Sequence, residues 1–218
     1  DWSYHNYRDS DIDTYIPSIQ WLVEQGVWII RMGEKMKKPI SFKNKRVIDY
    51  AFVEDRNAIL DFWFFANCTG CISTASGLDI LTMIYKKPNL FVNAMPLGSV
   101  SSFQECIWVP KNLKWKDTGI FLTLKEYLKH HYASSNQYEQ SGILIEDLSA
   151  EEILMSVKEF WYRIHGRLEE DIQGKYLHEN FLAIFKKWDD FKKYHKWIHP
   201  NFRIGSDWLK QRSKNFFQ

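Results

Sequence analysis

A hydroxyl-rich segment, STASGL at residues 73–78, follows a predicted strand at residues 70–74 and leads into a predicted helix. Free backbone N–H groups and the positive dipole end at the start of a helix suit a pyrophosphate, and side-chain hydroxyls add further donors. The same residue types also make a good helix N-cap without any ligand. The chain has no GxGxxG and no GxxxxGK[ST] segment, so neither a dinucleotide site nor a P-loop site is supported. The segment therefore predicts either a diphosphate site or a simple cap.

Two arginines are candidates for neutralising such an anion. Arg31 lies in an otherwise apolar run at residues 27–32. A buried arginine is costly unless it meets an anion, and its planar fork suits phosphate or carboxylate. An ion pair with an acidic residue such as Asp49 is the alternative to a ligand contact. Arg8 stands alone near the start of the chain, and its surroundings by themselves assign it no role.

Cysteine and histidine pairs at metal-binding spacing also occur. Cys68 and Cys71 form a C-x-x-C pattern, but a zinc site would need a second pair of ligands, so buried structural cysteines are the favoured interpretation. His195 and His199 are four residues apart and could share a helix face. Because no acidic or cysteine ligands occur near them at a matching spacing, we expect these histidines to be exposed to solvent rather than to bind a metal.

The elements that would position these residues alternate between strands and helices. Short apolar runs predict strands at residues 27–32, 46–51, 70–74, 88–93 and 106–109, and helical spacing predicts helices at 12–23, 56–67, 78–86 and 124–132. This order predicts an α/β fold with a doubly wound, mostly parallel, Rossmann-like sheet. Ligands of such sheets bind beyond the carboxyl ends of the strands. The residues at or just after these ends are Arg31, Asp49, Tyr50, Ser73, Thr74, Asn93, Leu97 and Gly98.

The last third of the chain is predicted to be mainly helical. A final strand is expected at residues 142–146, and the sequence SAEE at 149–152 is a capping box that begins a helix ending near His165. A second helix carries an apolar face that ends at Trp188. We therefore predict a Rossmann-like domain over residues 1–148 and a helical C-terminal extension over residues 149–218.

Composition excludes several classes of protein. The 29 basic and 27 acidic residues leave a net charge of +2, too small for the overall positive field of a nucleic-acid-binding protein. The longest apolar run, residues 58–66, is interrupted by Asp61 and is too short to span a bilayer. Three cysteines are too few for a disulfide framework and favour a reducing compartment, so we expect a cytoplasmic protein. Lysine clusters within residues 35–46 and 186–196 predict solvated faces, with weak contact to the inner membrane surface or to an acidic glycan as the alternative.

Four motifs occur in order along the first part of the chain: RDSDIDTY at residues 8–15, RMG at 31–33, STASGL at 73–78 and KPNLFVN at 87–93. Together they resemble a family of bacterial glycosyltransferases found in surface-polysaccharide gene clusters. In that family an R-[ND]-S-x-[IF]-x-x-[YF] segment precedes a helix, a strand ends in R-M-G, and an S-x-S-G-L turn is followed by K-P-x-x-x-V-N. The resemblance covers residues 4–128 and continues weakly in FRIGSDWL near the end.

The resemblance implies the C-terminal half of a GT-B architecture, the type with two Rossmann domains, whose acceptor-side domain lies upstream. It implies a nucleotide-sugar co-substrate, no bound cofactor or metal, and transfer to a glycan or lipid-linked acceptor. The donor would bind over Thr74, Ser76, Gly77 and Leu78, with Thr74 in place of the first serine of the family pattern. Because the loops after the second and fourth predicted strands flank the same edge of the sheet, we expect the base and ribose near Asp49, Tyr50, Asn93 and Leu97.

A more distant similarity to fucosyltransferases, in which an arginine of an H-x-R-R-x-D-like segment contacts the diphosphate, would give Arg8 that role. We expect Arg8 and Arg31 to act as the catalytic cations that stabilise the departing diphosphate.

Two other functions remain open. Asp9, Asp11 and Asp13 satisfy the D-x-D pattern by which metal-dependent glycosyltransferases hold a divalent cation on a diphosphate. These carboxylates precede a helix, however, where capping is the favoured interpretation. The second possibility is a non-catalytic module that binds a carbohydrate or a partner protein through exposed aromatic side chains.

Overall fold

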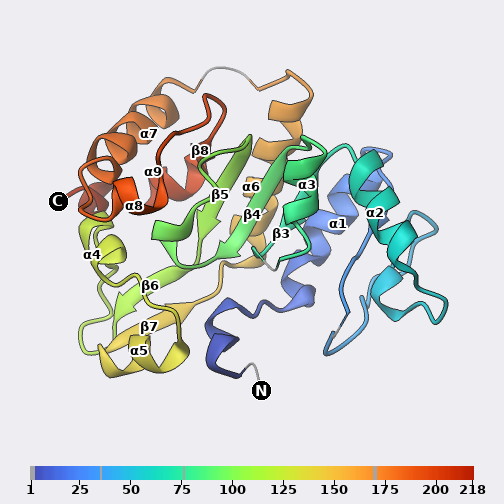
Figure 1. Ribbon diagram of the computed structural model, residues 1–218, viewed down its shortest axis with the longest axis horizontal. Helices are drawn as coiled ribbons and strands as arrows, with labels where there is room; N and C mark the ends of the chain where they lie inside the picture. The colour runs from blue at the N-terminus through green and yellow to red at the C-terminus, as the bar shows by residue number, and fades with distance from the viewer. Residues whose placement is uncertain (1–2, 35, 76, 169–170) are drawn as a thin grey trace.

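A parallel sheet forms the centre of the molecule in the computed structural model, which describes residues 3–34, 36–75, 77–168 and 171–218 (Figure 1). The strand order is β3-β4-β5-β8, and each neighbouring pair is parallel. The prediction of an α/β fold with a mostly parallel sheet is therefore confirmed. The strands are β3 (Cys71–Ser73), β4 (Asn89–Ala94), β5 (Cys106–Pro110) and β8 (Arg203–Ile204).

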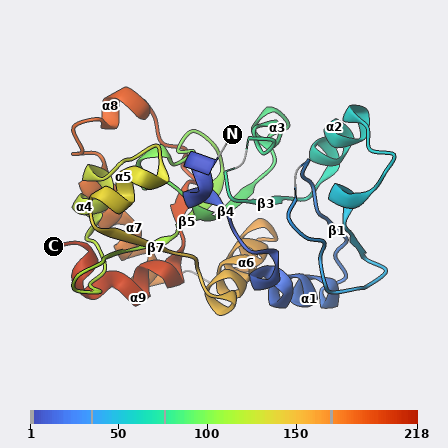
Figure 2. The same cartoon turned by 90° about the horizontal axis from the view of Figure 1, so that it is seen from below.

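Two smaller strand pairs lie outside the central sheet. The parallel pair β1 (Ile29–Ile30) and β2 (Val47–Ile48) forms a sheet of its own, and β1 lies on the far side of β3 from β4 and β5 (Figure 2). The strand predicted at residues 142–146 is β7 (Ile143–Glu146). It pairs antiparallel with β6 (Asn112–Trp115), a strand that the sequence pattern did not indicate.

Helices cover both faces of the sheet. Figure 2 shows α1, α6 and α9 on one face and α3 on the other. The helices are α1 (Ile16–Glu24), α2 (Ala58–Asn67), α3 (Ile80–Ile84), α4 (Leu124–Lys129), α5 (Ser135–Gln140), α6 (Ala150–Ile164), α7 (Ile172–Phe185), α8 (Phe191–Tyr194) and α9 (Ser206–Phe216). Short 3-10 helices are η1 (Ser3–Arg8), η2 (Ile12–Tyr15), η3 (Tyr50–Phe52) and η4 (Leu97–Ser99).

Local sequence explains where two of these helices begin. Pro17 lies in the first turn of α1, where its missing N–H has no intrahelical partner to lose, and the four residues before α1 form η2 instead of extending the helix. The predicted capping box at the start of α6 is confirmed. Ser149 Oγ accepts from the backbone N–H of Glu152 at 3.2 Å, and Glu152 Oε2 accepts from the N–H of Ser149 at 2.8 Å.

The core is built on β4 and β5. Every residue of both strands is buried, as expected for parallel strands that are covered on both faces. The rings of Phe91 and Trp108, on these neighbouring strands, lie 4.9 Å apart. The mainly apolar composition of β4 and β5 was therefore a reliable signal for the two central strands.

The segment after residue 148 shares this sheet and core. Helix α6 contacts α1 and β4, β8 pairs with β5, and α9 packs against α7 and α6. Glu159 of α6 accepts hydrogen bonds from the backbone N–H of Ser206, at 2.8 Å, and from its hydroxyl, at 3.0 Å. Residues on both sides of the predicted 148/149 boundary thus belong to one hydrophobic core.

A buried histidine in this region makes stability depend on pH. His178 of α7 lies near Phe181 and Phe202, with ring centroids 6.5 and 6.1 Å away, and its Nδ1 accepts from the N–H of Ile204 at 3.4 Å. Burial, followed by repulsion from Arg203 and other cations, lowers the pKa of His178 to about 3. The imidazole is therefore neutral in the folded protein well below the pH at which it charges in the unfolded chain.

Because the folded-state pKa of His178 is depressed, its contribution to stability is present above the unfolded pKa of about 6.5 and is lost as the pH falls towards 3. We expect His178→Gln to reduce the pH dependence of the unfolding free energy by about 1.4 kcal/mol per pH unit below pH 6. Urea unfolding at pH 4, 5, 6 and 7 measures this slope. His165→Gln, at an exposed position, is the control, and equal slopes in wild type and His178→Gln would contradict the expectation.

Candidate functional site

The carboxyl ends of β3, β4 and β5 carry polar residues at one edge of the central sheet. Ser73 ends β3, Asn93 is the penultimate residue of β4, and Lys111 directly follows β5. Because the three strands are parallel and adjacent, these residues lie at the same edge. This edge is where a ligand of an open α/β sheet is expected.

An N-terminal segment, residues 8–13, crosses this edge, and we call it the strap. Arg8 Nη2 donates to the backbone oxygen of Ala75, beyond β3. Lys111 Nζ donates to the backbone oxygen of Asp9, and Asn93 Nδ2 donates to Ser10 Oγ at 2.8 Å. Three consecutive residues of the strap therefore contact residues at the ends of three different strands. In Figures 1 and 2 this part of the chain is the dark blue segment near the N label.

The turn after β3 has an unusual backbone. Ala75 and Gly77 have φ values of +61° and +103°, in the left-handed region that alanine rarely adopts. The hydroxyl of Ser73 accepts from the N–H of Ala75 at 3.2 Å and donates to Asp79 Oδ2 at 2.5 Å. Both backbone groups of Ala75 are therefore hydrogen-bonded: its N–H donates to Ser73, and its carbonyl oxygen accepts from Arg8. Such strained residues are often found where a ligand binds.

This turn differs from the predicted helix start. The following helix, α3, begins at Ile80 and is only five residues long, with Asp79 as its N-cap, whereas the sequence predicted a helix over residues 78–86. Thr74 is half-buried, and Gly77 and Leu78 are exposed beside it. Ser76, predicted to contact the donor, lies outside the described residues. A ligand could therefore reach the exposed residues of the turn, but it would not meet the N-terminus of a long helix.

A buried hydrogen-bond network lies beneath the strap. Asn93, also in the left-handed region with φ +53°, is fully buried, and its Oδ1 accepts from the N–H of Leu148 at 2.7 Å. Its amide group reaches Ser10, whose hydroxyl lies 3.0 Å from the Tyr15 hydroxyl. Burial raises the pKa of Tyr15 to about 12, so the phenol stays protonated. Asn93, predicted to contact the donor, thus links the strap to β4.

Sequence reasoning missed Lys111. Its ammonium group lies 2.6 Å from Asp147 Oδ1 and also bonds to the strap, and its side chain is only 4% exposed. Lys111 lies two residues after the end of the strand predicted at residues 106–109, so it satisfied the same positional rule that selected the other candidates. This position was the sequence feature that could have identified Lys111 as a candidate. Its pairing with Asp147, 36 residues away, was not readable from the sequence.

Arg31 and Asp49 form a separate group on the β1–β2 pair. Arg31 Nη1 lies 3.3 Å from Asp49 Oδ2 and donates to the backbone oxygen of Lys38 at 2.8 Å. The carboxylate also accepts from the N–H of Ile40 at 2.7 Å. The structure therefore shows the ion pair that was the alternative to a ligand contact. Neighbouring Tyr50 is buried, and its hydroxyl accepts from the N–H of Asn57 at 3.1 Å.

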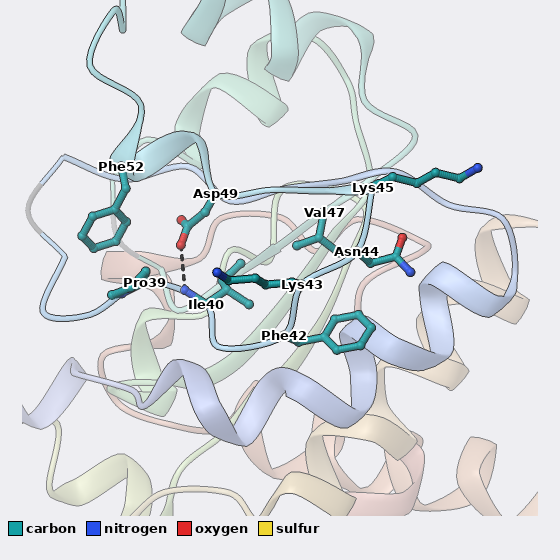
Figure 3. Close-up of a pocket in the computed structure, with 9 residues that line it drawn as sticks. All are labelled: Pro39, Ile40, Phe42, Lys43, Asn44, Lys45, Val47, Asp49 and Phe52. Carbon is teal, nitrogen blue, oxygen red and sulfur yellow. Dashed lines mark hydrogen bonds between the residues drawn. The ribbon is translucent and has the colours of Figure 1, made fainter.

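A cavity of about 570 Å³ opens beside β2 (Figure 3). The carboxylate of Asp49 lies within it, hydrogen-bonded to Ile40, and the ring of Phe52 lies nearby. Of the residues predicted near the base and ribose, Tyr50, Asn93 and Leu97 are buried, whereas Asp49 lines this cavity. The lining residues are Pro39, Ile40, Phe42, Lys43, Asn44, Lys45, Val47, Asp49 and Phe52.

Leu97 and Gly98 pack into an aromatic cluster. Both lie in η4 and are buried. The ring of His131 lies against Gly98 and stacks on Trp188 and Tyr194, with centroids 5.4 and 5.1 Å apart.

His195, predicted to be exposed, belongs to this cluster as well, so that prediction is wrong. Helix α8 ends before His195, the residue is buried, and its Nε2 and Nδ1 contact Gly98 O and Ser102 Oγ at 2.8 and 2.9 Å. The helical spacing of His195 and His199 predicted that both would lie exposed on one helix, but α8 ends at Tyr194 and contains neither residue.

The acidic residues of the strap are paired with lysines from the loop after β1. Lys37 lies 2.7 Å from Asp9, and Lys38 bridges Asp11 and Asp13 at 2.7 and 2.5 Å. Asp11 Oδ1 also accepts from the N–H of Asp13 at 3.0 Å, which confirms its predicted capping role at η2. The hydrogen bond from Lys38 lowers the pKa of Asp11. The D-x-D carboxylates are thus neutralised by nearby ammonium groups.

Neither a metal-binding cluster nor a membrane-spanning helix occurs in the part of the chain that the structure describes. No group of three or more histidine, cysteine, aspartate or glutamate side chains is arranged to hold a metal ion there. None of its helices is both long enough and apolar enough to cross a bilayer. Cys68 and Cys71 are free thiols, but both are half-buried and not fully buried as predicted, and desolvation raises the pKa of each.

Comparison with known proteins gives no match. No protein-family model matches the sequence, and no curated protein or solved structure is significantly similar to it. The chemistry of the carboxyl edge therefore carries the functional inference.

Proposed function

We propose that the chain is the nucleotide-sugar-binding part of a glycosyltransferase of the GT-B type. The diphosphate of the donor binds over the turn at residues 73–78, beside Arg8, without a metal ion. One observation carries the proposal: the guanidinium of Arg8 contacts the backbone of Ala75 in that turn, although the two residues are 67 positions apart. The two segments that the glycosyltransferase resemblance selected are therefore neighbours in space.

The chemistry of this neighbourhood suits a departing diphosphate. Transfer of the sugar develops negative charge on the leaving group, which fixed donors and cations stabilise. A guanidinium has five N–H donors, and the Ala75 carbonyl accepts from Nη2. Arg8 is partly exposed, so it is accessible to a ligand that lies on the turn. The exposed backbone at Gly77 allows close approach of phosphate oxygens, because glycine has no side chain.

The remaining parts of the reaction follow from the same proposal. The base and ribose extend from the turn towards β2, where Asp49 lines the open cavity. The sugar acceptor, a glycan or lipid-linked glycan, and the catalytic base belong to an acceptor-side domain of the full enzyme. The protein acts in the cytoplasm, with weak contact to the inner membrane surface.

Thermal unfolding with UDP, GDP, CDP or dTDP tests this function. A nucleoside diphosphate at roughly a hundred times its Kd stabilises the folded state by about 2.7 kcal/mol, which raises Tm by several degrees. We expect one of the four to do so in the presence of EDTA. Gly77→Val should abolish the shift, because φ at this position is +103° and valine cannot adopt it without strain. Gly142→Ala, at another left-handed glycine in the turn between α5 and β7, is the control for a local effect on stability.

Two outcomes would favour other functions. Exposed Trp28, Trp63 and Trp197 could stack on sugars, so stabilisation by oligosaccharides but by none of the nucleotides would indicate a carbohydrate-binding module. A nucleotide shift that appears only with Mn²⁺ or Mg²⁺ would indicate that Asp9, Asp11 and Asp13 hold a metal ion.

A further inference from the structure

We propose that Lys111 is a positioning residue that holds the strap, and with it Arg8, against the turn at residues 73–78. The role of Arg8 towards a diphosphate rests on the proposed function, whereas the attachment of the strap does not. The Lys111 ammonium adds to the Asn93–Ser10 hydrogen bond that also ties the strap to the sheet. It donates to the backbone oxygen of Asp9 and pairs with Asp147 Oδ1 at 2.6 Å.

The location of this link couples it to Arg8. Asp9 directly follows Arg8, so fixing its carbonyl group fixes the backbone from which the Arg8 side chain reaches Ala75. Lys111 itself is rigidly placed, because it follows the fully buried strand β5. The position of the Arg8 guanidinium relative to the sheet therefore depends on the backbone of Asp9, which Lys111 holds.

Burial makes this attachment stronger than the other ionic contacts of the strap. The Lys111 side chain is 4% exposed, whereas the side chains of Lys37 and Asp9, which form the strap's outer ion pair, are 85% and 51% exposed. Exposed pairs contribute little, because water screens them and both side chains lose conformational freedom. A buried ammonium is costly unless it is paired and hydrogen-bonded, so the folded state strongly favours keeping both of its partners in place.

The chain contains a matched control. Lys114, three residues after Lys111, pairs with Glu146, the residue before Asp147, at 2.5 Å. Both ion pairs join the same two regions of chain, but the ammonium of Lys114 lies over the Phe121 ring, and Lys111 is the one that bonds to the strap. Lys111→Met and Lys114→Met therefore remove the same chemical group from neighbouring positions.

Hydrogen exchange of the 218-residue chain tests the attachment. In Lys111→Met we expect amides of residues 9–15 to exchange about tenfold faster or more, because the opening of a segment costs less once a charged hydrogen bond is lost. Amides of β4 and β5 should keep their protection, and Lys114→Met should match wild type at residues 9–15. The double variant Lys111→Met with Asp147→Asn, which removes the ammonium without leaving an unpaired carboxylate, serves if Lys111→Met alone does not fold. Unchanged exchange at residues 9–15 in the variant that folds would overturn the proposal.

A double-mutant cycle tests the coupling to Arg8. It uses whichever of UDP, GDP, CDP and dTDP stabilises the wild type. If Lys111 acts through Arg8, Arg8→Ala should weaken binding by about tenfold in wild type but by less than about twofold in Lys111→Met. Equal losses in both backgrounds would show that Lys111 does not position Arg8. If none of the four nucleotides binds, the proposed function fails, while the exchange experiment still decides whether Lys111 holds the strap.

Discussion

On the proposed function, Arg8→Ala is expected to reduce turnover of the glycosyltransferase by about a hundredfold or more, which is the scale of effect when one fixed stabiliser of a developing anion is removed. The fold should survive, because Arg8 is partly exposed and its hydrogen bond is to a carbonyl in an open turn. The measurement is kcat with a saturating nucleotide-sugar donor, together with Tm of the same variant. Arg8→Lys keeps the charge but loses the planar fork, so we expect an intermediate rate.

Arg31→Ala separates the two arginines. The sequence assigned the same role to both, but the Arg31 and Asp49 side chains, 14% and 19% exposed, pair with each other. Removing Arg31 leaves a largely buried carboxylate without its counter-ion, so we expect a loss of stability of about 2 kcal/mol. A hundredfold loss of turnover at unchanged Tm would instead show that Arg31 contacts the donor.

An unchanged rate in Arg8→Ala would remove the main support for the proposed diphosphate site.

Gly98→Ala is expected to destabilise the protein by roughly 3 kcal/mol, a large effect for one methyl group. A Cβ atom at Gly98 would overlap the His131 ring and come within 2.7 Å of Trp188. The His131 ring cannot move away cheaply, because it stacks on both Trp188 and Tyr194. Urea unfolding measures the loss.

A second substitution makes that expectation specific. His131→Ala removes the ring that the new methyl group would meet, so the double variant should be less destabilised than the sum of the two single variants. Additive losses would show that the His131 contact is not the cause. A change within about 0.5 kcal/mol in Gly98→Ala would show that the cluster around η4 adjusts without cost.

The main elements of the sheet were predictable because their signals are local. Strand β5 is a continuous apolar run and β4 is apolar at four of its six positions, and burial on both faces of a parallel sheet favours that composition. The capping box at Ser149 and Glu152 was readable for the same reason, since its two partners are three residues apart. Strand β8 could not be predicted from the sequence. Its two residues count as a strand only because they pair with β5, about a hundred residues away in the sequence.

The candidate site likewise has some features that the sequence predicts and others that depend on long-range contacts. The sequence by itself determined which residue types follow each strand, and therefore that hydroxyl, amide and cationic groups gather at one edge of the sheet. It also determined that Asp11 caps a helical turn, because that contact spans two residues. Only the tertiary structure decided that Arg8 reaches Ala75, that Arg31 pairs with Asp49 and that Lys111 bonds to Asp9. An arginine or lysine satisfies its charge equally well with any nearby anion or carbonyl group, so its partner depends on which distant segments the fold brings within reach.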